Sequence, residues 1–260
     1  MTQPPKQPSK KTWKGSVPRA WRFAKKLLLI LFIAQLIYIL LLKWVYPPIT
    51  LTQTGDMISG WFHHYDFHRD YVREDEISPN MRLAVMASED QLFPEHGGFD
   101  WKNIEKAMKY NEKHPGRVHG ASTISQQTAK NVFLWQGRNF IRKGFEVYFT
   151  KMIEWTWGKR RILNTYLNVI QMGQGIYGVE AASRQYFHKP AKNLTRAEAA
   201  LIAACLPNPV RFRPDAPSRY IQARQRWILG QMSALEGEPD IAALVREPDE
   251  AQPASKQSPK

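Results

Sequence analysis

The longest hydrophobic run of the chain lies near its N-terminus. Residues 27–42 are apolar apart from Gln35, and the aromatic residues Trp44 and Tyr46 follow at the far edge of the run. An α-helix over residues 27–46 would be about 30 Å long, which matches the hydrocarbon thickness of a bilayer. The pattern therefore predicts one membrane-spanning helix.

A cleaved signal peptide is the alternative interpretation of this run. The apolar stretch is longer than the hydrophobic region of most signal peptides, and Pro47 and Pro48 follow where a cleavage site needs small residues. We therefore favour an uncleaved anchor.

Beyond the anchor, apolar positions recur at helical spacing in several separate segments. Three sets of residues match the signals that start helices, namely an N-cap serine before proline and two capping boxes. They are Ser78 with Pro79, Thr123 with Gln126, and Thr195 with Glu198. No segment shows sustained period-two alternation with hairpin turns, so we expect a mostly α-helical body.

These patterns divide the chain into five regions. We expect a basic tail over residues 1–26, the membrane helix over residues 27–46, a linker or stalk over residues 47–76, the folded body over residues 77–235 and a polar C-terminal tail over residues 236–260. The aromatic stretch 61–71 either lies near the bilayer surface or covers the core, and the pattern does not choose between the two.

The composition is that of a folded protein without disulfides. The chain has 260 residues, of which 43% are hydrophobic, and nine are tryptophan, which excludes a wholly disordered chain. Its single cysteine, Cys205, excludes an intrachain disulfide and a cysteine-based metal site. We expect Cys205 to be a small buried hydrophobic residue.

The positive charge is concentrated at the N-terminus. The formal net charge is +14, and the first acidic residue of the chain is Asp56. The cations that precede the apolar run are Lys6, Lys10, Lys11, Lys14, Arg19, Arg22, Lys25 and Lys26. By the positive-inside rule this end lies in the cytoplasm and the body lies on the other side of the membrane. We therefore expect no nucleic-acid partner.

Glu89 is the first candidate catalytic residue. It follows residues 81–87, which are apolar apart from Arg82. Burial beside apolar side chains would make this carboxylate hold a proton more tightly, so that it could exchange protons near neutral pH. The alternative is an ordinary acid at a helix end that faces water.

A second set of polar residues follows at helical spacing. Thr123, Gln126, Gln127 and Lys130 would share one helix face, on which they present hydroxyl, amide and ammonium groups. Such groups suit a sugar and a phosphate. A solvated helix face is the alternative.

A third set places cations around one acid. Arg138, Arg142, Lys143 and Glu146 would lie on one side of a helix. The cations favour an ionised Glu146, whereas burial acts in the opposite sense on Glu89, so the two carboxylates would have divided roles. The cations could neutralise a phosphate leaving group, and a surface salt bridge is the alternative.

Two further basic segments are less specific. In residues 159–168, Lys159 and Asn168 are site candidates, and the apolar positions pack inward. In residues 101–117, apolar positions alternate with lysines at helical spacing, which fits either a helix in the headgroup region of a membrane or an ordinary surface helix. The histidines show no metal-ligand spacing.

Taken in order, these motifs resemble those of the family 51 glycosyltransferases, the peptidoglycan glycan polymerases. The matching residues are Glu89-Asp90, Phe93 and His96; Gly120, Ser122-Thr123-Ile124, Gln126-Gln127 and Lys130-Asn131; Arg142-Lys143 and Glu146; Lys159, Ile162-Leu163 and Tyr166-Leu167-Asn168; and Ala181-Ala182 with Tyr186-Phe187. The resemblance covers residues 77–214. The remaining residues are too few for a penicillin-binding transpeptidase domain, so we expect a monofunctional enzyme.

The resemblance implies a lysozyme-like, mostly α glycosyltransferase domain on a single N-terminal transmembrane helix in the bacterial inner membrane, with the catalytic domain in the periplasm. It implies lipid II and the nascent glycan strand as substrates, membrane lipid as a partner, and contacts with other wall-synthesis and division proteins. It assigns catalysis to Glu89 and Glu146. The residues that it assigns to substrate binding are Asp90, His96, Ser122, Thr123, Gln126, Gln127, Lys130, Asn131, Arg138, Arg142, Lys143, Lys159 and Asn168.

No cofactor is required on this resemblance, but stimulation by Mg²⁺ or Mn²⁺, with an ion near Glu146, stays open. Gln171 and Gln174 stand where acidic residues are frequent in the family, which puts a metal role for that loop in doubt. Two other functions are alternatives: a glycan-cleaving lysozyme or lytic transglycosylase, which would explain Glu89 but not the cations, and a non-catalytic scaffold of wall synthesis.

Overall fold

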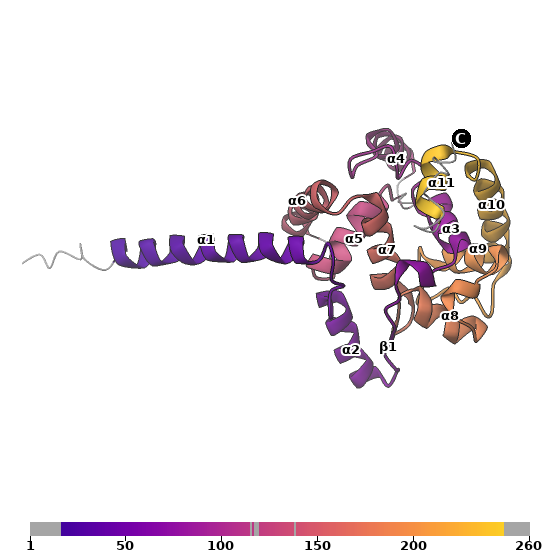
Figure 1. The fold of residues 1–260 in the computed structure, drawn as a ribbon, viewed down its shortest axis with the longest axis horizontal. Coiled ribbons are helices and arrows are strands. Elements are labelled where there is room, and N and C mark those ends of the chain that lie inside the picture. Colours follow the sequence, from indigo (N-terminus) through magenta and orange to yellow (C-terminus); the bar gives the residue numbers. More distant parts are fainter. Residues whose placement is uncertain (1–16, 115, 117–119, 138, 247–260) are drawn as a thin grey trace, which may run out of the picture. The chain divides into compact units, whose positions relative to one another are not determined.

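The structure is a computed structural model, and it describes residues 17–114, 116, 120–137 and 139–246 (Figure 1). The chain forms two compact units, which divide between Trp44 and Val45. We describe each unit by itself.

The first unit contains the long helix α1 (Val17–Leu41), whose apolar side chains are mostly exposed. Its segment Arg19–Leu41 has a mean hydropathy of 2.1 and, at 23 residues, is about 35 Å long, enough to cross a bilayer. Within the described ranges it is the one helix that meets these criteria of length and composition. The predicted single apolar helix near the N-terminus is therefore confirmed as a candidate membrane anchor.

The bounds of this helix differ from the predicted residues 27–46. The helix ends at Leu41, and the last helical bond runs from Leu42 N to Tyr38 O at 3.0 Å. Lys43 N and Trp44 N then bond back by three positions, to Leu40 O and Leu41 O, both at 3.1 Å. Such bonds form a tight turn instead of a further α-helical turn. The hydrophobic pattern continues to Tyr46, but the helical hydrogen bonds do not.

The predicted linker over residues 47–76 is wrong, because this segment is part of the second unit. It contains α2 (Leu51–His63), β1 (His68–Arg69) and the short 3₁₀ helix η1 (Glu74–Glu76). A capping box of Thr50 and Gln53 starts α2, which packs on α5 (Ile124–Phe133). This capping box was visible in the sequence but was not used in the prediction.

The second unit is mostly helical, as predicted. Besides α2 and α5, its α-helices are α3 (Pro79–Glu89), α4 (Trp101–Lys113), α6 (Phe140–Thr156), α7 (Lys159–Val169), α8 (Val179–Phe187), α9 (Arg196–Cys205), α10 (Arg219–Leu235) and α11 (Pro239–Val245), with a short 3₁₀ helix η2 (Ala191–Asn193). Helix α3 packs against α9, α10 and α11, and α5 packs against α6 and α7 (Figure 1). The three predicted N-caps, Ser78, Thr123 and Thr195, all form.

A small sheet lies beside α8. Its strand order is β1-β3-β2, with β3 (Ile176–Tyr177) parallel to β1 and antiparallel to β2 (Gln171–Gly173). Gly175 makes the turn between β2 and β3 with a φ of +69°, and a Cβ there would lie 2.2 Å from the carbonyl oxygen of Asp66. Strands of two and three residues are too short to show the alternation on which strand prediction depends.

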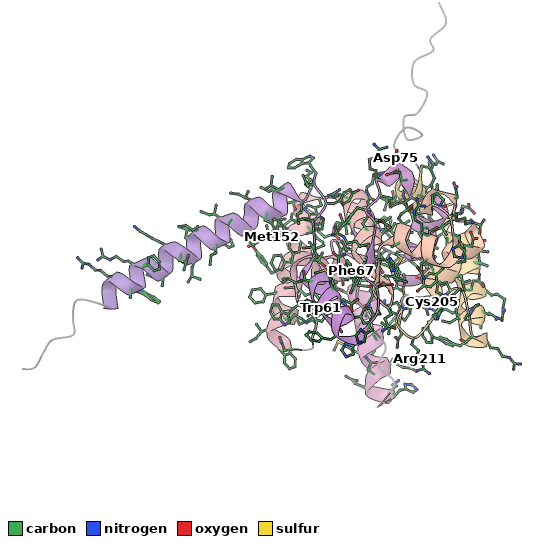
Figure 2. All side chains as sticks on the ribbon, turned by 90° about the horizontal axis from the view of Figure 1, so that it is seen from below. Trp61, Phe67, Asp75, Met152, Cys205 and Arg211 are labelled. Atoms are coloured by element: carbon green, nitrogen blue, oxygen red, sulfur yellow. The ribbon has the colours of Figure 1, made fainter. Side chains whose placement is uncertain are left out.

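The core of this unit surrounds α3 and α9. Every residue from Met81 to Ala87 is buried, and Cys205 at the end of α9 is buried as predicted. Figure 2 labels Cys205 among the side chains of this unit. Burial raises the pKa of the Cys205 thiol to about 12. This cysteine is therefore a packing residue.

The predicted C-terminal tail over residues 236–260 is wrong for its first part. Helix α11 packs on α3, and its Ile241 is buried. Two arginines fasten its C-terminal end: Arg82 donates to the carbonyl oxygen of Val245 at 2.9 Å, and Arg160 donates to that of Arg246 at 2.9 Å. The rest of the predicted tail, residues 247–260, lies outside the described residues.

Candidate active site

Glu89 is the last residue of α3 and opens onto a cleft. Its side chain is 15% exposed, and both of its oxygens accept hydrogen bonds. Gln127 Nε2 donates to Oε2 at 3.0 Å, and Ser88 Oγ donates to Oε1 at 3.4 Å. The surroundings of this carboxylate are therefore polar, whereas the sequence predicted burial beside apolar side chains.

A chain of hydrogen bonds leads from Glu89 into the core. The hydroxyl of Tyr166 on α7 donates to Gln127 Oε1 at 3.3 Å, and the amide nitrogen of the same Gln127 donates to Glu89. Burial raises the pKa of the Tyr166 hydroxyl, and the negative charges of Glu89 and Asp90 raise it further. Tyr166 is therefore a neutral donor that fixes the orientation of the Gln127 amide.

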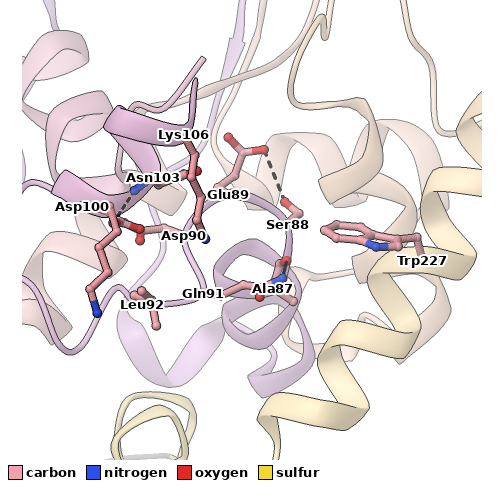
Figure 3. Close-up of a pocket in the computed structure, with 11 residues that line it drawn as sticks. Ala87, Ser88, Glu89, Asp90, Gln91, Leu92, Asp100, Asn103, Lys106 and Trp227 are labelled. Carbon is pink, nitrogen blue, oxygen red and sulfur yellow. Dashed lines mark hydrogen bonds between the residues drawn. The ribbon is translucent and has the colours of Figure 1, made fainter. Parts of the chain in front are cut away.

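The cleft beside Glu89 has a volume of about 360 Å³ and lies between the end of α3, α4 and α10 (Figure 3). Trp227 of α10 and Lys106 of α4 both line it. The other polar side chains of its wall belong to Ser88, Asp90, Gln91, Asp100, Lys102 and Asn103. An indole ring, amides and charged groups around one carboxylate can hold a sugar with polar substituents.

Asp90 connects the end of α3 to the start of α5. One of its oxygens accepts the backbone N–H of Ile124 at 2.9 Å, and its carboxylate also contacts His96 Nε2 at 2.9 and 3.0 Å. The backbone N–H of Gly98 donates to His96 Nδ1 at 3.1 Å, which leaves Nε2 as the donor to Asp90. Asp90 and His96 thus hold Gln127 of α5 in reach of Glu89.

Lys159 lies in a buried ionic group below this connection. Its ammonium pairs with Glu154 at 2.8 Å, donates to the carbonyl oxygen of His96 and lies 4.5 Å from the centre of the Phe93 ring. Burial lowers the pKa of Lys159, and the bond with Glu154 acts in the opposite direction. Lys159 is therefore committed to the scaffold, although the sequence placed it among the substrate-binding residues.

The cations of α5 and α6 gather around Glu146. The carboxylate of Glu146 is 4% exposed and pairs with Arg142 Nη1 at 3.1 Å and with the ammonium of Lys143. Burial lowers the pKa of Lys130; the charge of Glu146 opposes this effect, and Arg142 and Lys143 reinforce it. The three cations exceed the one acid in charge, so the cluster can bind an anion.

Helix α5 joins this cluster to Glu89. Gln127 and Lys130 are three residues apart on α5. Gln127 donates a hydrogen bond to Glu89, and the charge of Glu146 acts on the pKa of Lys130. Three residues correspond to about 4.5 Å along a helix axis and to neighbouring positions on one face. The carboxylate and the cations therefore border one region of the molecule.

The residues near Glu146 do not fit a divalent metal ion. Such an ion needs several oxygen ligands, whereas Glu146 is one carboxylate that already has two cationic partners. Within the described part of the chain, no group of three or more His, Cys, Asp and Glu side chains comes together in a way that could hold a metal ion. The ion considered near Glu146 thus has no ligand set there.

The structure gives three predicted binding residues a structural role instead. Both ends of the Asn168 amide bond the backbone of Val72, at 2.9 and 3.1 Å, so this buried side chain fastens the segment after β1 to α7. Thr123 and Gln126 form the capping box of α5 and are buried. These bonds use the Asn168 amide, the Thr123 hydroxyl and the side-chain oxygen of Gln126.

The other predicted residues are at or near the two groups. Ser122 is exposed, and its carbonyl oxygen accepts from Gln127 Nε2 at 3.4 Å. Asn131 is buried and donates to the carbonyl oxygen of Gln127 at 2.8 Å. Arg138 lies outside the described residues.

Three residues at the site were not predicted from the sequence patterns. Glu154, whose side chain is 8% exposed, is the partner of Lys159 and Ser125. Arg224 and Trp227 of α10 reach Glu89 and its cleft. The basic, amphipathic spacing of α6 around Glu146 gave a local signal, but none exists for α10. Only the packing of α10 on α3 brings Arg224 near Glu89.

Comparison with known proteins gives a consistent result. A family model described as Transglycosylase matches residues 55–233. A biosynthetic peptidoglycan transglycosylase of Klebsiella oxytoca is 61% identical over 186 residues, which cover 72% of this chain and 76% of that protein. A protein of the same name from Shigella boydii serotype 4 is 52% identical over 221 residues, covering 84% of this chain and 91% of the relative. A third, from Shigella dysenteriae serotype 1, is 56% identical over 195 residues, covering 74% and 81%.

Proposed function

Since this chain belongs to the transglycosylase family and is a lysozyme-like, helical glycosyltransferase of peptidoglycan synthesis, we propose that it polymerises glycan strands from lipid II. The growing lipid-linked strand is the donor, and the 4-hydroxyl of the GlcNAc of lipid II is the acceptor. Undecaprenyl pyrophosphate leaves, and the configuration at the anomeric carbon inverts. The junction at α5 supports this proposal most directly, because it brings a carboxylate and a group of cations to one region.

In this reaction Glu89 is the general base. It removes the proton of the acceptor hydroxyl, whose oxygen then attacks the anomeric carbon of the donor MurNAc. Gln127 fixes Oε2 of Glu89 at 3.0 Å, whereas Oε1 has only a longer bond of 3.4 Å from Ser88, and the carboxylate borders the cleft. A carboxylate that accepts hydrogen bonds from an amide and a hydroxyl and lies open to a cleft can take up a proton during the reaction.

The cations bind the leaving diphosphate in this proposal. Lys130, Arg142 and Lys143 can neutralise the charge that develops on the phosphate oxygens as the bond to the sugar breaks. Glu146 orients Arg142 and Lys143 through its two ion pairs, at 3.1 Å to Arg142. Glu146 is thus a positioning residue for these cations.

The membrane location follows from the substrate. A donor with a polyprenyl chain stays in the bilayer, so an enzyme with one apolar helix near its N-terminus meets it there. We propose that α1 spans the inner membrane with its basic end in the cytoplasm and the catalytic unit in the periplasm. Other proteins of wall synthesis and division are proposed partners; nucleic acid is not.

One assay tests the proposed reaction. Purified full-length protein is incubated with labelled lipid II in detergent or vesicles, and the products are separated by electrophoresis before and after muramidase digestion. We expect a ladder that muramidase collapses to disaccharide units. A protein that makes no polymer but shortens purified glycan strands would instead be a glycan-cleaving enzyme, and the proposal would be wrong. Repeating the assay with Mg²⁺, with Mn²⁺ and with a chelator shows whether a divalent ion stimulates the reaction.

A further inference from the structure

Arg224 of α10 approaches the carboxylate of Glu89. Its Nη2 lies 3.9 Å from Glu89 Oε1, whereas Gln127 bonds the other oxygen, Oε2. The position of α10 beside the end of α3 is fixed by packing between the two helices and by a hydrogen bond of 3.0 Å from Gln91 Nε2 to Gln231 Oε1. The approach of Arg224 is therefore a consequence of the fold and not of a loop that could take many positions.

The surroundings of Arg224 leave its guanidinium available to Glu89. Its side chain is 24% exposed, and its Nε is buried without a hydrogen-bond partner among the described residues. A buried N–H group without a partner is costly, which is unusual for a residue whose role is purely structural.

We propose that Arg224 is a positioning residue for the transfer reaction, which keeps the carboxylate of Glu89 aimed at the cleft before the proton of the sugar hydroxyl is taken up. The proposal rests on the proposed function, in which Glu89 is the general base. A cation at 3.9 Å attracts a carboxylate and restricts the positions that its oxygens can take. The base is then in place at the start of each cycle.

The other groups around Glu89 do not replace this interaction. Ser88 and Gln127 are neutral donors. On α7, the buried Tyr166 is neutral, and on the far side of Glu89 the acid Asp90 is occupied by His96 and by the start of α5. The remaining charged groups of the cleft wall are Asp100, Lys102 and Lys106 from α4 and the residue before it. In the described part of the chain, the ion pair of Glu89 is with Arg224.

The test compares kcat and KM for lipid II between the wild type and Arg224→Gln. We expect kcat to fall about three- to tenfold, because a carboxylate that is no longer aimed at the cleft reaches the acceptor hydroxyl less often. KM should change little, because Arg224 acts on Glu89 and not on the substrate. Arg224→Lys keeps the charge, and its kcat should lie close to that of the wild type.

Arg226→Gln is the matched control, since it removes the same charge from an exposed position two residues along α10. Its kcat and KM should equal those of the wild type. Should Arg224→Gln not fold, Arg224→Met keeps the apolar stem of the side chain and should show the same fall in kcat. The role of Arg224 is overturned if its neutral variants keep the wild-type kcat, if Arg224→Lys loses as much kcat as they do, or if Arg226→Gln shows the same fall.

The same assay separates this proposal from the proposed function. If Glu89→Gln is inactive while the neutral variants of Arg224 keep the wild-type kcat, Glu89 remains the base and only the role of Arg224 is wrong. If Glu89→Gln polymerises lipid II at a near-normal rate, the assignment of the base is wrong, and the role of Arg224 is wrong with it.

Discussion

The two functional carboxylates of this protein lie in opposite settings. Glu89 ends a helix, lies at a cleft and accepts hydrogen bonds from an amide and a hydroxyl, with the nearest cation at 3.9 Å. Glu146 lies within α6, is 4% exposed and is paired directly with Arg142 and Lys143. One carboxylate thus has an oxygen that can take up a proton, whereas the other is fully used in holding cations.

The difference shows how one residue type serves two purposes in the same site. A general base must change its charge during the reaction, so it cannot be locked into a buried ion pair. A residue that orients cations must keep its charge, so burial beside those cations suits it. Helix α5 brings the two settings together, because Gln127 touches the first and Lys130 the second.

The largest expected effect is that of Glu89→Gln. This change keeps the shape of the side chain and removes the proton acceptor, so we expect the initial rate of lipid II polymerisation to fall by about 10²- to 10⁴-fold. The melting temperature should stay close to that of the wild type, because the partners of Glu89 are mostly neutral. Glu95→Gln, at an exposed position of the same loop, is the control and should leave the rate unchanged.

Glu146→Ala should affect stability as well as activity. It leaves Arg142, whose side chain is 11% exposed, without its partner, and we expect the free energy of unfolding to fall by about 3 to 5 kcal/mol. The rate should fall because the cations lose their orientation. Denaturant unfolding of the purified protein measures the first effect.

An exposed pair of the same spacing serves as the control for Glu146. Glu105 and Lys109 on α4 are 67% and 68% exposed, so Glu105→Ala should change the free energy of unfolding by less than about 0.5 kcal/mol. Equal effects of Glu146→Ala and Glu105→Ala on stability would contradict the conclusion that the buried ion pairs of Glu146 stabilise the fold more than an exposed pair does.

The contrast between these carboxylates was partly visible in the sequence. The apolar residues 81–87 placed Glu89 at a helix end, and the spacing of three and four residues placed Glu146 beside its cations. Both are local relations, which helical periodicity determines. The expectation of apolar surroundings for Glu89 was wrong because Gln127 comes from another helix.

Relations between distant segments were the ones that the sequence could not give. Asn168 was taken as a binding residue, but its amide is used by Val72, whose position next to α7 depends on the whole fold. For the same reason Arg224 was not predicted. Thr123 and Gln126 carried both a capping signal and a binding signal, and the structure shows that capping uses their side chains.

A pH-dependent effect is expected at Lys130, next to the locked carboxylate. Burial lowers the pKa of Lys130 below the ordinary lysine value, so its ammonium loses its proton at a lower pH than a solvated lysine would. If the Lys130 ammonium binds the leaving diphosphate, the rate should fall on the alkaline side at a lower pH than the ordinary lysine pKa would give. Lys130→Arg keeps its charge there, and its alkaline limb should lie at higher pH.

The contribution of Lys130 to stability should change with pH in the opposite direction to the rate. Between the lowered pKa and the ordinary value, the unfolded chain binds more protons at Lys130 than the folded chain does, so its contribution to the free energy of unfolding rises with pH. An alkaline fall in rate without loss of folded protein would thus support a role in binding. Lys109→Arg, at an exposed position, should shift neither measurement; an unchanged alkaline limb in Lys130→Arg would exclude Lys130 as its cause.

The smallest effect is expected for Tyr166→Phe, which tests the far end of the hydrogen-bond chain to Glu89. The change removes only the donor to Gln127 Oε1 at 3.3 Å, while the bond from Gln127 Nε2 to Glu89 remains. We expect a two- to fivefold lower rate and a loss of about 1 kcal/mol in the free energy of unfolding. Tyr220→Phe, at an exposed position on α10, is the control and should change neither value.

The size of this effect shows whether Tyr166 only orients Gln127 and Glu89 or also takes part in proton transfer. Because burial raises the pKa of the Tyr166 hydroxyl, this residue stays protonated and can only orient Gln127, which in turn orients Glu89. Each step away from Glu89 should therefore cost less, with Gln127→Ala falling between Glu89→Gln and Tyr166→Phe in rate. A rate for Tyr166→Phe as low as that for Glu89→Gln, at unchanged stability, would mean that the hydroxyl takes part in the proton transfer itself. Tyr166 would then belong to the reacting groups and not to the scaffold that orients Glu89.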